Sequence, residues 1–447
     1  MPRLHIIIAI TFIFLVGTAA WASEEESGSA QGGVTLTEAI DLALSNNLEL
    51  KAAEEGVAAA QFGIKAAKAL NRFSLSANES YSKAGPGITE KIPGLGEFDI
   101  RPSKWQDVFS IALSQPIFTF GLNRNVLRIA EYGLDSALAD YQAKINEIKY
   151  NVESSYYDLV QLKMLLDVQQ QNLERARNDK HNAELRFEAG QSAKFEVIRA
   201  DVAVKNAEEQ LIGTKKKIEV AKLAWTRLIG IGEYREPVVV NPEAVKPSDL
   251  SFALDEAEEV ALRMRPELKG LTAGIGSVET GASLKSLRPD LRFIGSYNLS
   301  DWATTFTTKE DWRLVFNLSI PLWDGGKANA DVAKGMALAE QLRIKSRDLE
   351  ELIKIEVADA YLAVAESAER MNATAATLAL AEEAKRMADI GYTEGVVTLQ
   401  ELLSAEVDLS GAKVNRIGAV YGYLKAKAKL RKAMGVDTLL DEMTSGN

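Results

Sequence analysis

The chain has 447 residues, a formal net charge of -11 and no cysteine. The acidic balance, without a cluster of Lys and Arg, argues against nucleic acid as a partner, and the absence of cysteine excludes disulfides and a thiol nucleophile. His181 is the only histidine beyond the first residues, so the ligands of a zinc enzyme are missing and we expect no metal and no cofactor. The chain also has no Ser-His-Asp set and no Gly-rich phosphate loop, which argues against an enzyme.

The N-terminal residues predict a secretory signal peptide at 1–22. Arg3 supplies the positive start, Ile6 to Val16 form an apolar run, and Ala20-Trp21-Ala22 has the small-x-small pattern of a cleavage site. A single-pass anchor is the alternative, but the apolar run is short for a membrane-spanning helix. We expect a flexible N-terminal segment over 23–35.

The remaining chain is predicted to contain one structural unit twice, at 36–235 and at 236–435, followed by a C-terminal tail at 436–447. Several motifs recur in the same order in both halves. The matched pairs are Pro116-Ile117-Phe118 with Pro321-Leu322-Trp323, Tyr156 with Tyr361, Gly190 with Gly395, and Glu196 with Glu401. An ordered series of this kind indicates an internal repeat, in which each copy forms a helix, two strands, a long helix and a shorter helix.

Alternating apolar and polar residues predict two strands in each copy, at about 73–82 and 108–117 and at about 291–299 and 312–322. Loops of Gly, Pro and polar residues would join the two strands of each pair. The alternation places the following apolar residues on one side of their strands: Phe109, Ile111, Leu113, Leu314, Phe316 and Leu318. This is the lipid-out, water-in pattern of a membrane β-barrel, although a half-buried strand in a soluble sheet alternates in the same way.

The helices are predicted to pack through heptads. No proline occurs between Gly121 and Pro237, so 122–188 is expected to form one helix about 100 Å long. An early helix at about 47–70 and a returning helix at about 195–229 would together match its length. In the second copy a small residue recurs every seven positions, at Ala405, Ala412, Ala419, Ala426 and Ala433. Such a seam suits a wall built from a single layer of helices, although an ordinary antiparallel coiled coil shows the same period.

These features together resemble the TolC family of outer-membrane efflux proteins. The resemblance covers about 36–435 and rests on three doubled motifs. The first is the Ala-x-x-x-Ala-Leu motif in a helix, which starts at Ala39 and again at Ala257. The second is the strand end, Pro116-Ile117-Phe118 and Pro321-Leu322-Trp323. The third is the Phe/Tyr-x-x-Gly turn, whose glycines are Gly190 and Gly395. One departure is Asn46-Asn47-Leu48, which lacks the proline often found there, whereas the second copy has Arg265-Pro266.

The resemblance implies a mixed α and β membrane protein. Each protomer of a homotrimer would contribute four β-strands to a 12-stranded outer-membrane barrel, which a long α-helical coiled-coil barrel would continue into the periplasm. The protein would lie in the outer membrane, in contact with its lipid, and conduct substrates passively to the cell exterior. Its partners would be a periplasmic adaptor protein and an inner-membrane pump, in a tripartite efflux or type I secretion system. The alternative is a periplasmic coiled-coil spacer protein without channel activity.

The resemblance also implies two kinds of site at the periplasmic tip. The adaptor would dock at the turns, which contain Gly190, Gln191, Gly395, Val396 and Thr398. The pore constriction would be formed by Glu196 and Glu401, with Ser404 at a position where a second acid is found in this family. The plainer alternatives are that the glycines only turn the chain and that the acids only solvate the helix surface.

Overall fold

The computed structural model divides the chain into two units, Met1–Gly33 and Val34–Asn447. It describes residues 33–83, 85, 88–94, 96–101, 105–239, 241–248, 250–284, 288–302 and 308–439. The predicted signal peptide and nearly all of the predicted flexible segment lie outside the described residues. Among these residues, no helix combines the length and the apolar character that crossing a membrane requires.

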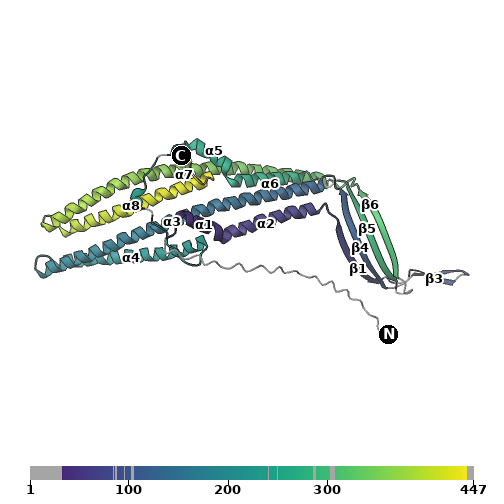
Figure 1. The fold of residues 1–447 in the computed structure, drawn as a ribbon, viewed down its shortest axis with the longest axis horizontal. Helices are drawn as coiled ribbons and strands as arrows, with labels where there is room; N and C mark the ends of the chain where they lie inside the picture. The colour runs from purple at the N-terminus through teal and green to yellow at the C-terminus, as the bar shows by residue number, and fades with distance from the viewer. Residues whose placement is uncertain are drawn as a thin grey trace, which may run out of the picture. The chain divides into compact units, whose positions relative to one another are not determined.

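Pairs of helices and groups of strands follow one another along the second unit (Figure 1). Its first part contains α1 (Leu36–Asn46), α2 (Leu48–Ala69), β1 (Ser74–Lys83), β2 (Ile88–Ile92), β3 (Gly96–Arg101), β4 (Trp105–Phe118), α3 (Leu122–Glu188) and α4 (Lys194–Ile229). Its second part contains the 3-10 helix η1 (Pro242–Ala244), α5 (Leu254–Met264), α6 (Pro266–Ala282), β5 (Asp290–Trp302), β6 (Thr308–Ser319), α7 (Lys327–Thr393) and α8 (Leu399–Met434). The single long helix expected over 122–188 is confirmed, since α3 has these bounds.

Two details of the strands differ from the sequence prediction. The segment expected to be a loop between the first two strands contains the β2–β3 hairpin, in which Gly94 follows Pro93 with φ +88°. A Pro-Gly pair suits a tight turn, because proline presets one φ and glycine adopts the positive one. In addition, β6 ends at Ser319 rather than at 322, before Pro321, which has no N–H to donate to a neighbouring strand.

One four-stranded antiparallel sheet connects the two parts of the chain, with the order β1-β4-β5-β6. Its central pair joins strands that are distant in sequence, with Ile111 opposite Tyr297. Because β1 and β6 are the outer strands, each leaves one backbone edge without a partner in this sheet.

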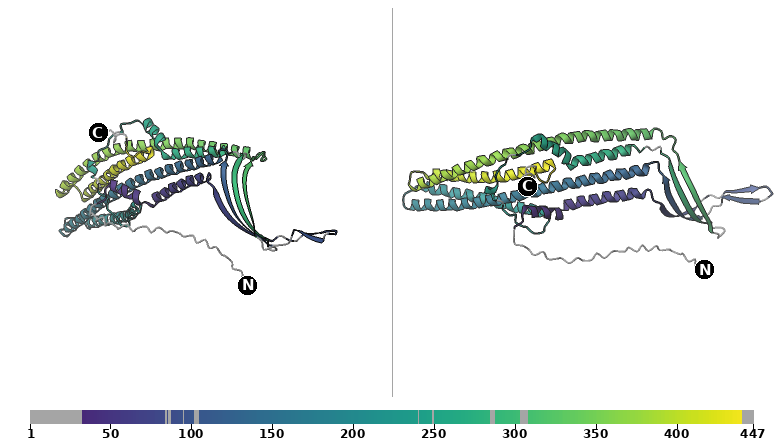
Figure 2. Two further views of the ribbon diagram at one scale, coloured as in Figure 1. Left: turned by 45° about the vertical axis from the view of Figure 1, so that its right-hand side comes forward. Right: turned by 45° about the horizontal axis from the view of Figure 1, so that its top comes forward.

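The helices form a layer in which each neighbours the next. Near the sheet the order of neighbours is α2, α3, α6, α7, and farther from it the order is α4, α3, α8, α7. In both views of Figure 2, α3 runs beside α2 along one part of its length and beside α4 along the other. Four alanines of the predicted seam lie at these contacts, since Ala412, Ala419, Ala426 and Ala433 are buried, whereas Ala405 is half-buried. Small side chains there allow the helix axes to approach closely.

The segment between α4 and α5 joins the two main apolar cores. Its start packs against the core built around Trp225 and Tyr156, and its end, at Phe252, belongs to the core of α5, α7 and α8. Two matched tyrosines bind it to the long helices. Tyr156 of α3 donates a hydrogen bond to the Val238 carbonyl (2.7 Å), and Tyr361 of α7 donates one to the Phe252 carbonyl (2.9 Å).

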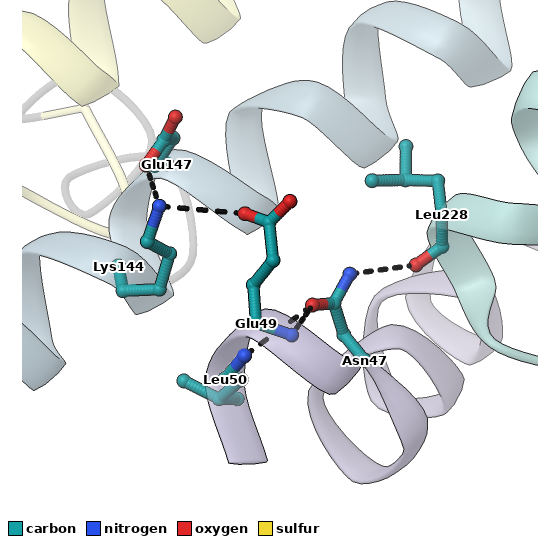
Figure 3. A network of polar contacts seen from close by, with 6 residues as sticks. All are labelled: Asn47, Glu49, Leu50, Lys144, Glu147 and Leu228. Atoms are coloured by element: carbon teal, nitrogen blue, oxygen red, sulfur yellow. Dashed lines mark hydrogen bonds and ion pairs between the residues drawn. The ribbon is translucent and has the colours of Figure 1, made fainter. Parts of the chain in front are cut away.

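The break between α1 and α2 shows how the chain compensates for the missing proline (Figure 3). The Asn47 side chain accepts hydrogen bonds from the N–H groups of Glu49 and Leu50, and its amide donates to the Leu228 carbonyl in the last turn of α4 (3.1 Å). An asparagine at this position satisfies free N–H groups of the new helix. Glu49 is in turn held by Lys144 of α3.

The corresponding break between α5 and α6 reaches the same arrangement by different chemistry. Pro266 starts α6, where the missing N–H costs nothing. The Arg265 guanidinium donates to the Ala433 carbonyl in the last turn of α8 (3.2 Å) and forms an ion pair with Glu356. Each break is therefore attached to the end of the returning helix, which positions the two helical hairpins.

Candidate functional site

The two predicted turns lie at the end of the helices that is opposite the four-stranded sheet (Figure 1). Gly190 ends α3 with φ +70° and Gly395 ends α7 with φ +76°. In this conformation the N–H of Gln191 reaches the Arg186 carbonyl and that of Val396 reaches the Gly391 carbonyl, both at 2.8 Å. These bonds satisfy carbonyl groups at the helix ends. The side chains of Gln191 and Val396 are exposed, Val396 at 79%.

The two turns differ in how the following helix begins. Thr398 caps α8 in a reciprocal capping box, in which its hydroxyl accepts from the Glu401 N–H and the Glu401 carboxylate accepts from the Thr398 N–H (2.8 Å). The backbone hydrogen bond from Thr398 holds the pKa of Glu401 below its usual value. Glu401 is exposed and lies one turn into the helix. Its carboxylate therefore has a structural partner within the protomer.

Glu196 occupies the corresponding position of α4 but has no such cap. The helix is preceded by Ala193, which has no side chain that can accept a hydrogen bond. Glu196 is half-buried and lies close enough to Tyr392 to contribute to the raised pKa of that phenol, whose main cause is burial. The two predicted constriction acids thus share the tip end of the helices but have different surroundings.

The six predicted strand residues lie on one face of the sheet. Residues directly opposite each other in antiparallel strands share a face. Leu113 and Leu314 both lie opposite Gly295, and Phe316 lies opposite Phe293, with ring centroids 5.1 Å apart. Phe109 and Ile111 follow Leu113 at alternate positions of β4, and Leu318 follows Phe316 on β6. At the middle of the sheet the other face carries mainly Ser and Asn, at Ser76, Asn78, Ser110, Ser296 and Asn298. The apolar face is interrupted by Glu79 and Glu310, which lie in the row of Phe109.

Two outer helices leave apolar side chains exposed. In Figures 1 and 2, α4 and α7 lie on opposite sides of the pair formed by α3 and α8. Apolar residues more than half exposed are Phe195, Ile198, Val202, Ile212, Val220 and Leu223 on α4, and Met336, Ile344, Ile355, Leu362, Leu380 and Met387 on α7. Helix faces of this kind normally pack against another element.

A cluster that the sequence patterns do not single out lies between the two hairpins. Asp179 of α3 contacts Glu406 of α8, and the Lys385 ammonium of α7 is 3.1 Å from the Glu406 carboxylate. The available signal was the heptad, because Lys385 continues the buried series Val357, Val364 and Met371 of α7.

The comparisons with known proteins agree with this architecture. The family model for the outer membrane efflux protein family matches residues 39–231 and 272–436. Nodulation protein T of Rhizobium leguminosarum bv. trifolii is 25% identical over 419 residues, which cover 90% of this chain and 85% of that protein. Outer membrane efflux protein BepC of Brucella suis biovar 1 is 20% identical over 425 residues, 92% of this chain and 87% of that one.

A solved structure shares the fold. The Campylobacter jejuni CmeC outer membrane channel superposes with a TM-score of 0.76 and 17% sequence identity, covering 92% of this chain and 88% of that one. The fold of this chain is therefore that of a TolC-like outer-membrane channel, and the resemblance noted in the sequence is confirmed. The chain belongs to the outer membrane efflux protein family.

Proposed function

We propose that the chain is the outer-membrane channel-tunnel of a tripartite efflux or type I secretion system. Its family consists of outer-membrane efflux proteins, one relative is named an outer membrane efflux protein, and a structural neighbour is described as an outer membrane channel. The channel would conduct passively, with energy from an inner-membrane pump that acts through a periplasmic adaptor. We propose no catalytic role, because the family consists of channels rather than enzymes.

The observation that carries this proposal is the pair of uncovered edges. β1 and β6 lie at opposite edges of the sheet, and edge strands with free N–H and C=O groups readily pair with another chain. Pairing β6 of one protomer with β1 of the next would join two different edges of the same protein. Contacts between unlike surfaces form a closed ring when the rotation that relates neighbouring protomers divides a full turn evenly. Four strands are too few for a barrel, since closure needs about eight, and a trimer would supply twelve.

The helix layer supports the same ring. Its uncovered apolar faces belong to α4 on one side and α7 on the other, which are the same two sides on which β1 and β6 lie. Packing α4 of one protomer against α7 of the next would bury both faces. A closed layer of helices around an axis would then form the periplasmic tunnel below the barrel.

We also propose that the chain is built from two repeats, at 36–235 and 236–435, after a signal peptide at 1–22 and before a tail at 436–447. The long helices α3 and α7 both have 67 residues, and the returning helices α4 and α8 both have 36. The Asn47–Leu228 and Arg265–Ala433 contacts lie at matching places in the two halves. An exported protein with this arrangement would place its sheet in the outer membrane and its helices in the periplasm.

The channel proposal is tested by purification and reconstitution. We expect the mature protein to require detergent, to migrate as a trimer, and to produce long-lived conductance steps in planar lipid bilayers. The spacer alternative predicts a protein that is soluble and monomeric without detergent and that produces no conductance. That result would contradict the proposal.

We propose that the adaptor docks at the two turns, because Gln191 and Val396 expose their side chains there while the glycines hold the backbone. Replacing both residues with Trp is expected to weaken adaptor crosslinking at least about tenfold, equivalent to about 1.4 kcal/mol, while the trimer stays intact. A matched control is Trp at Lys246, an exposed residue of the segment between α4 and α5, which lies outside the turns and outside the apolar faces of α4 and α7. Undiminished crosslinking in the tip variant would exclude the turns as the docking site.

A further inference from the structure

The contact between α3 and α8, which joins the two helical hairpins, changes character along its length. Next to the segment between α4 and α5 it is apolar, and Tyr157, Val160, Ile417 and Tyr421 share one buried cluster. The rings of Tyr157 and Tyr421 are 6.3 Å apart. This part of the contact buries apolar surface and is expected to stay closed.

Toward the turns the same contact becomes polar. Asn172 of α3 donates a hydrogen bond to the Ser410 hydroxyl of α8. Leu173, Ala176, Val204 and Ala207 form a buried apolar cluster within the α3–α4 hairpin that contains no residue of α8. A cavity of about 540 Å³, lined by residues of α3, α4 and α8 that include Glu406, reaches this seam. The large apolar cluster shared by α3 and α8 beside the segment between α4 and α5 therefore does not extend to this level.

One heptad beyond Asn172, the seam contains a carboxyl pair, Asp179 and Glu406. The Oδ2 atom of Asp179 is buried and finds no hydrogen-bond donor among the described residues. Two carboxylates can only repel each other, whereas a proton on one of them turns their contact into a hydrogen bond. Glu406 is also paired with Lys385, and these two side chains are only 16% and 13% exposed.

The charges around the pair do not balance without that proton. Lys385 also contacts Asp389 (2.5 Å), so one ammonium group faces three carboxyl groups when Asp179 is included. Burial, and then the contact with Glu406, raise the pKa of Asp179 to about 7. Burial lowers the pKa of Lys385, but Asp389 and Glu406 outweigh it and raise that pKa, so Lys385 stays charged at neutral pH.

Other charged groups surround the pair. On the α4 side, Lys180 is held by Asp201 (2.7 Å), which raises the pKa of Lys180 and lowers that of Asp201. Toward the turn, burial raises the pKa of Tyr392, and the Arg186 guanidinium lies 4.1 Å above its ring. The exposed His181 of α3 lies two residues from Asp179, and the substitution His181→Gln is included in every protein measured below so that a charge change near pH 7 is that of the carboxyl pair.

We propose that Asp179 and Glu406 form a proton-operated latch between the two hairpins. The latch is closed while the pair shares a proton and is weakened when the pair loses it. The neighbouring contacts between the hairpins do not depend on that proton; they join Asn172 with Ser410, Arg199 with Gln400, and Arg186 with the Tyr392 ring. Asp179 binds its proton more tightly in the closed state than it would when separated and solvated, so the proton stabilises the closed state. This stabilising free energy is fully present below the ordinary pKa of an aspartate, and it is lost as the pH rises through the raised pKa of Asp179.

The latch belongs to a single protomer, and only its effect on flow through the tunnel rests on the proposed function. Its test is a distance measurement that needs no channel activity. The chain has no native cysteine, so spin labels can be attached at Asn182→Cys on α3 and Ser404→Cys on α8, both exposed and nearer the turns than the pair. Pulsed electron paramagnetic resonance on labelled protein diluted with unlabelled protein reports their separation.

We expect one short separation at pH 5.5 and a growing population of longer separations up to pH 8.5. The ratio of the two populations should change by up to about tenfold per pH unit while the proton is lost. Asp179→Asn should remain in the short state at both pH values, because a neutral amide still donates to Glu406. Glu406→Gln gives the same test from the other helix if the first variant does not assemble.

Asp408→Asn is the matched control, since Asp408 is an exposed acid two residues from Glu406. It should keep the pH response of the unmodified protein. A separation that does not change with pH, or a response that persists in Asp179→Asn, would overturn the latch. Either result would leave the channel proposal intact, because conductance is measured separately.

Discussion

Ile111→Arg is expected to reduce insertion of the protein into lipid by about 2–4 kcal/mol, the cost of a charge on the lipid face at the bilayer midplane. Ile111 lies on the apolar face of the sheet, near the middle of β4, and is partly exposed in the protomer. In the proposed barrel this face meets lipid. Directly beside Ile111 on this face lie Ala77 and Tyr297, neither of which is acidic. The nearest acid is Glu79, two residues along β1, and an ion pair with it would offset part of the cost.

Ser110→Arg is the matched control, because Ser110 is the adjacent residue of the same strand and points to the opposite, polar face. Its hydroxyl donates only a long hydrogen bond, 3.4 Å, to the Asn78 carbonyl. An arginine there would reach water inside the proposed barrel. The measurement is the fraction of folded protein recovered in outer membranes or in lipid vesicles. Equal recovery of the two variants would show that the two faces do not differ in their contact with lipid.

Glu401→Gln is expected to reduce cation selectivity and to weaken block by a trivalent cation at least about tenfold. In the proposed trimer, three Glu401 carboxylates surround the axis, and like charges at close range attract cations. Two unit charges 4 Å apart interact by about 1 kcal/mol even in water. A trivalent ion that faces three carboxylates therefore loses at least the roughly 1.4 kcal/mol that corresponds to tenfold in affinity.

The glutamine variant separates the charge of Glu401 from its structural role. Glutamine can replace glutamate in a capping box, so the contacts with Thr398 at the start of α8 should survive. Glu401→Ala removes both the charge and the hydrogen bond from the Thr398 N–H, so it should also destabilise the start of α8. The measurement is the reversal potential and the trivalent block in planar bilayers. If selectivity and block in Glu401→Gln match those of the unmodified channel, Glu401 serves only as a helix cap.

Local patterns in the sequence predicted most of the helices and strands, although not the β2–β3 hairpin. The absence of proline between Gly121 and Pro237 predicted one long helix with the bounds of α3, and the alanines spaced by seven predicted the buried seam of α8. Strand alternation placed Phe109, Ile111 and Leu113 on one side of β4. These patterns succeed because the side-chain direction repeats every 3.5 or 2 residues, so the sequence by itself tells which face of an element is apolar.

The tertiary structure decided which of those faces meet. Only the fold shows that β4 pairs with β5 and that Glu401 accepts a hydrogen bond from Thr398. It also shows that Arg265 makes, in the second half of the chain, the contact with the returning helix that Asn47 makes in the first. The contact of Asp179 with Glu406 and Lys385 joins three helices that are far apart in the sequence. The hydrophobic effect is not directional, so a periodic sequence shows which face of a helix is buried but not which element covers it. The order of the helices in the folded layer determines that partner, and it also determines which charged side chains meet.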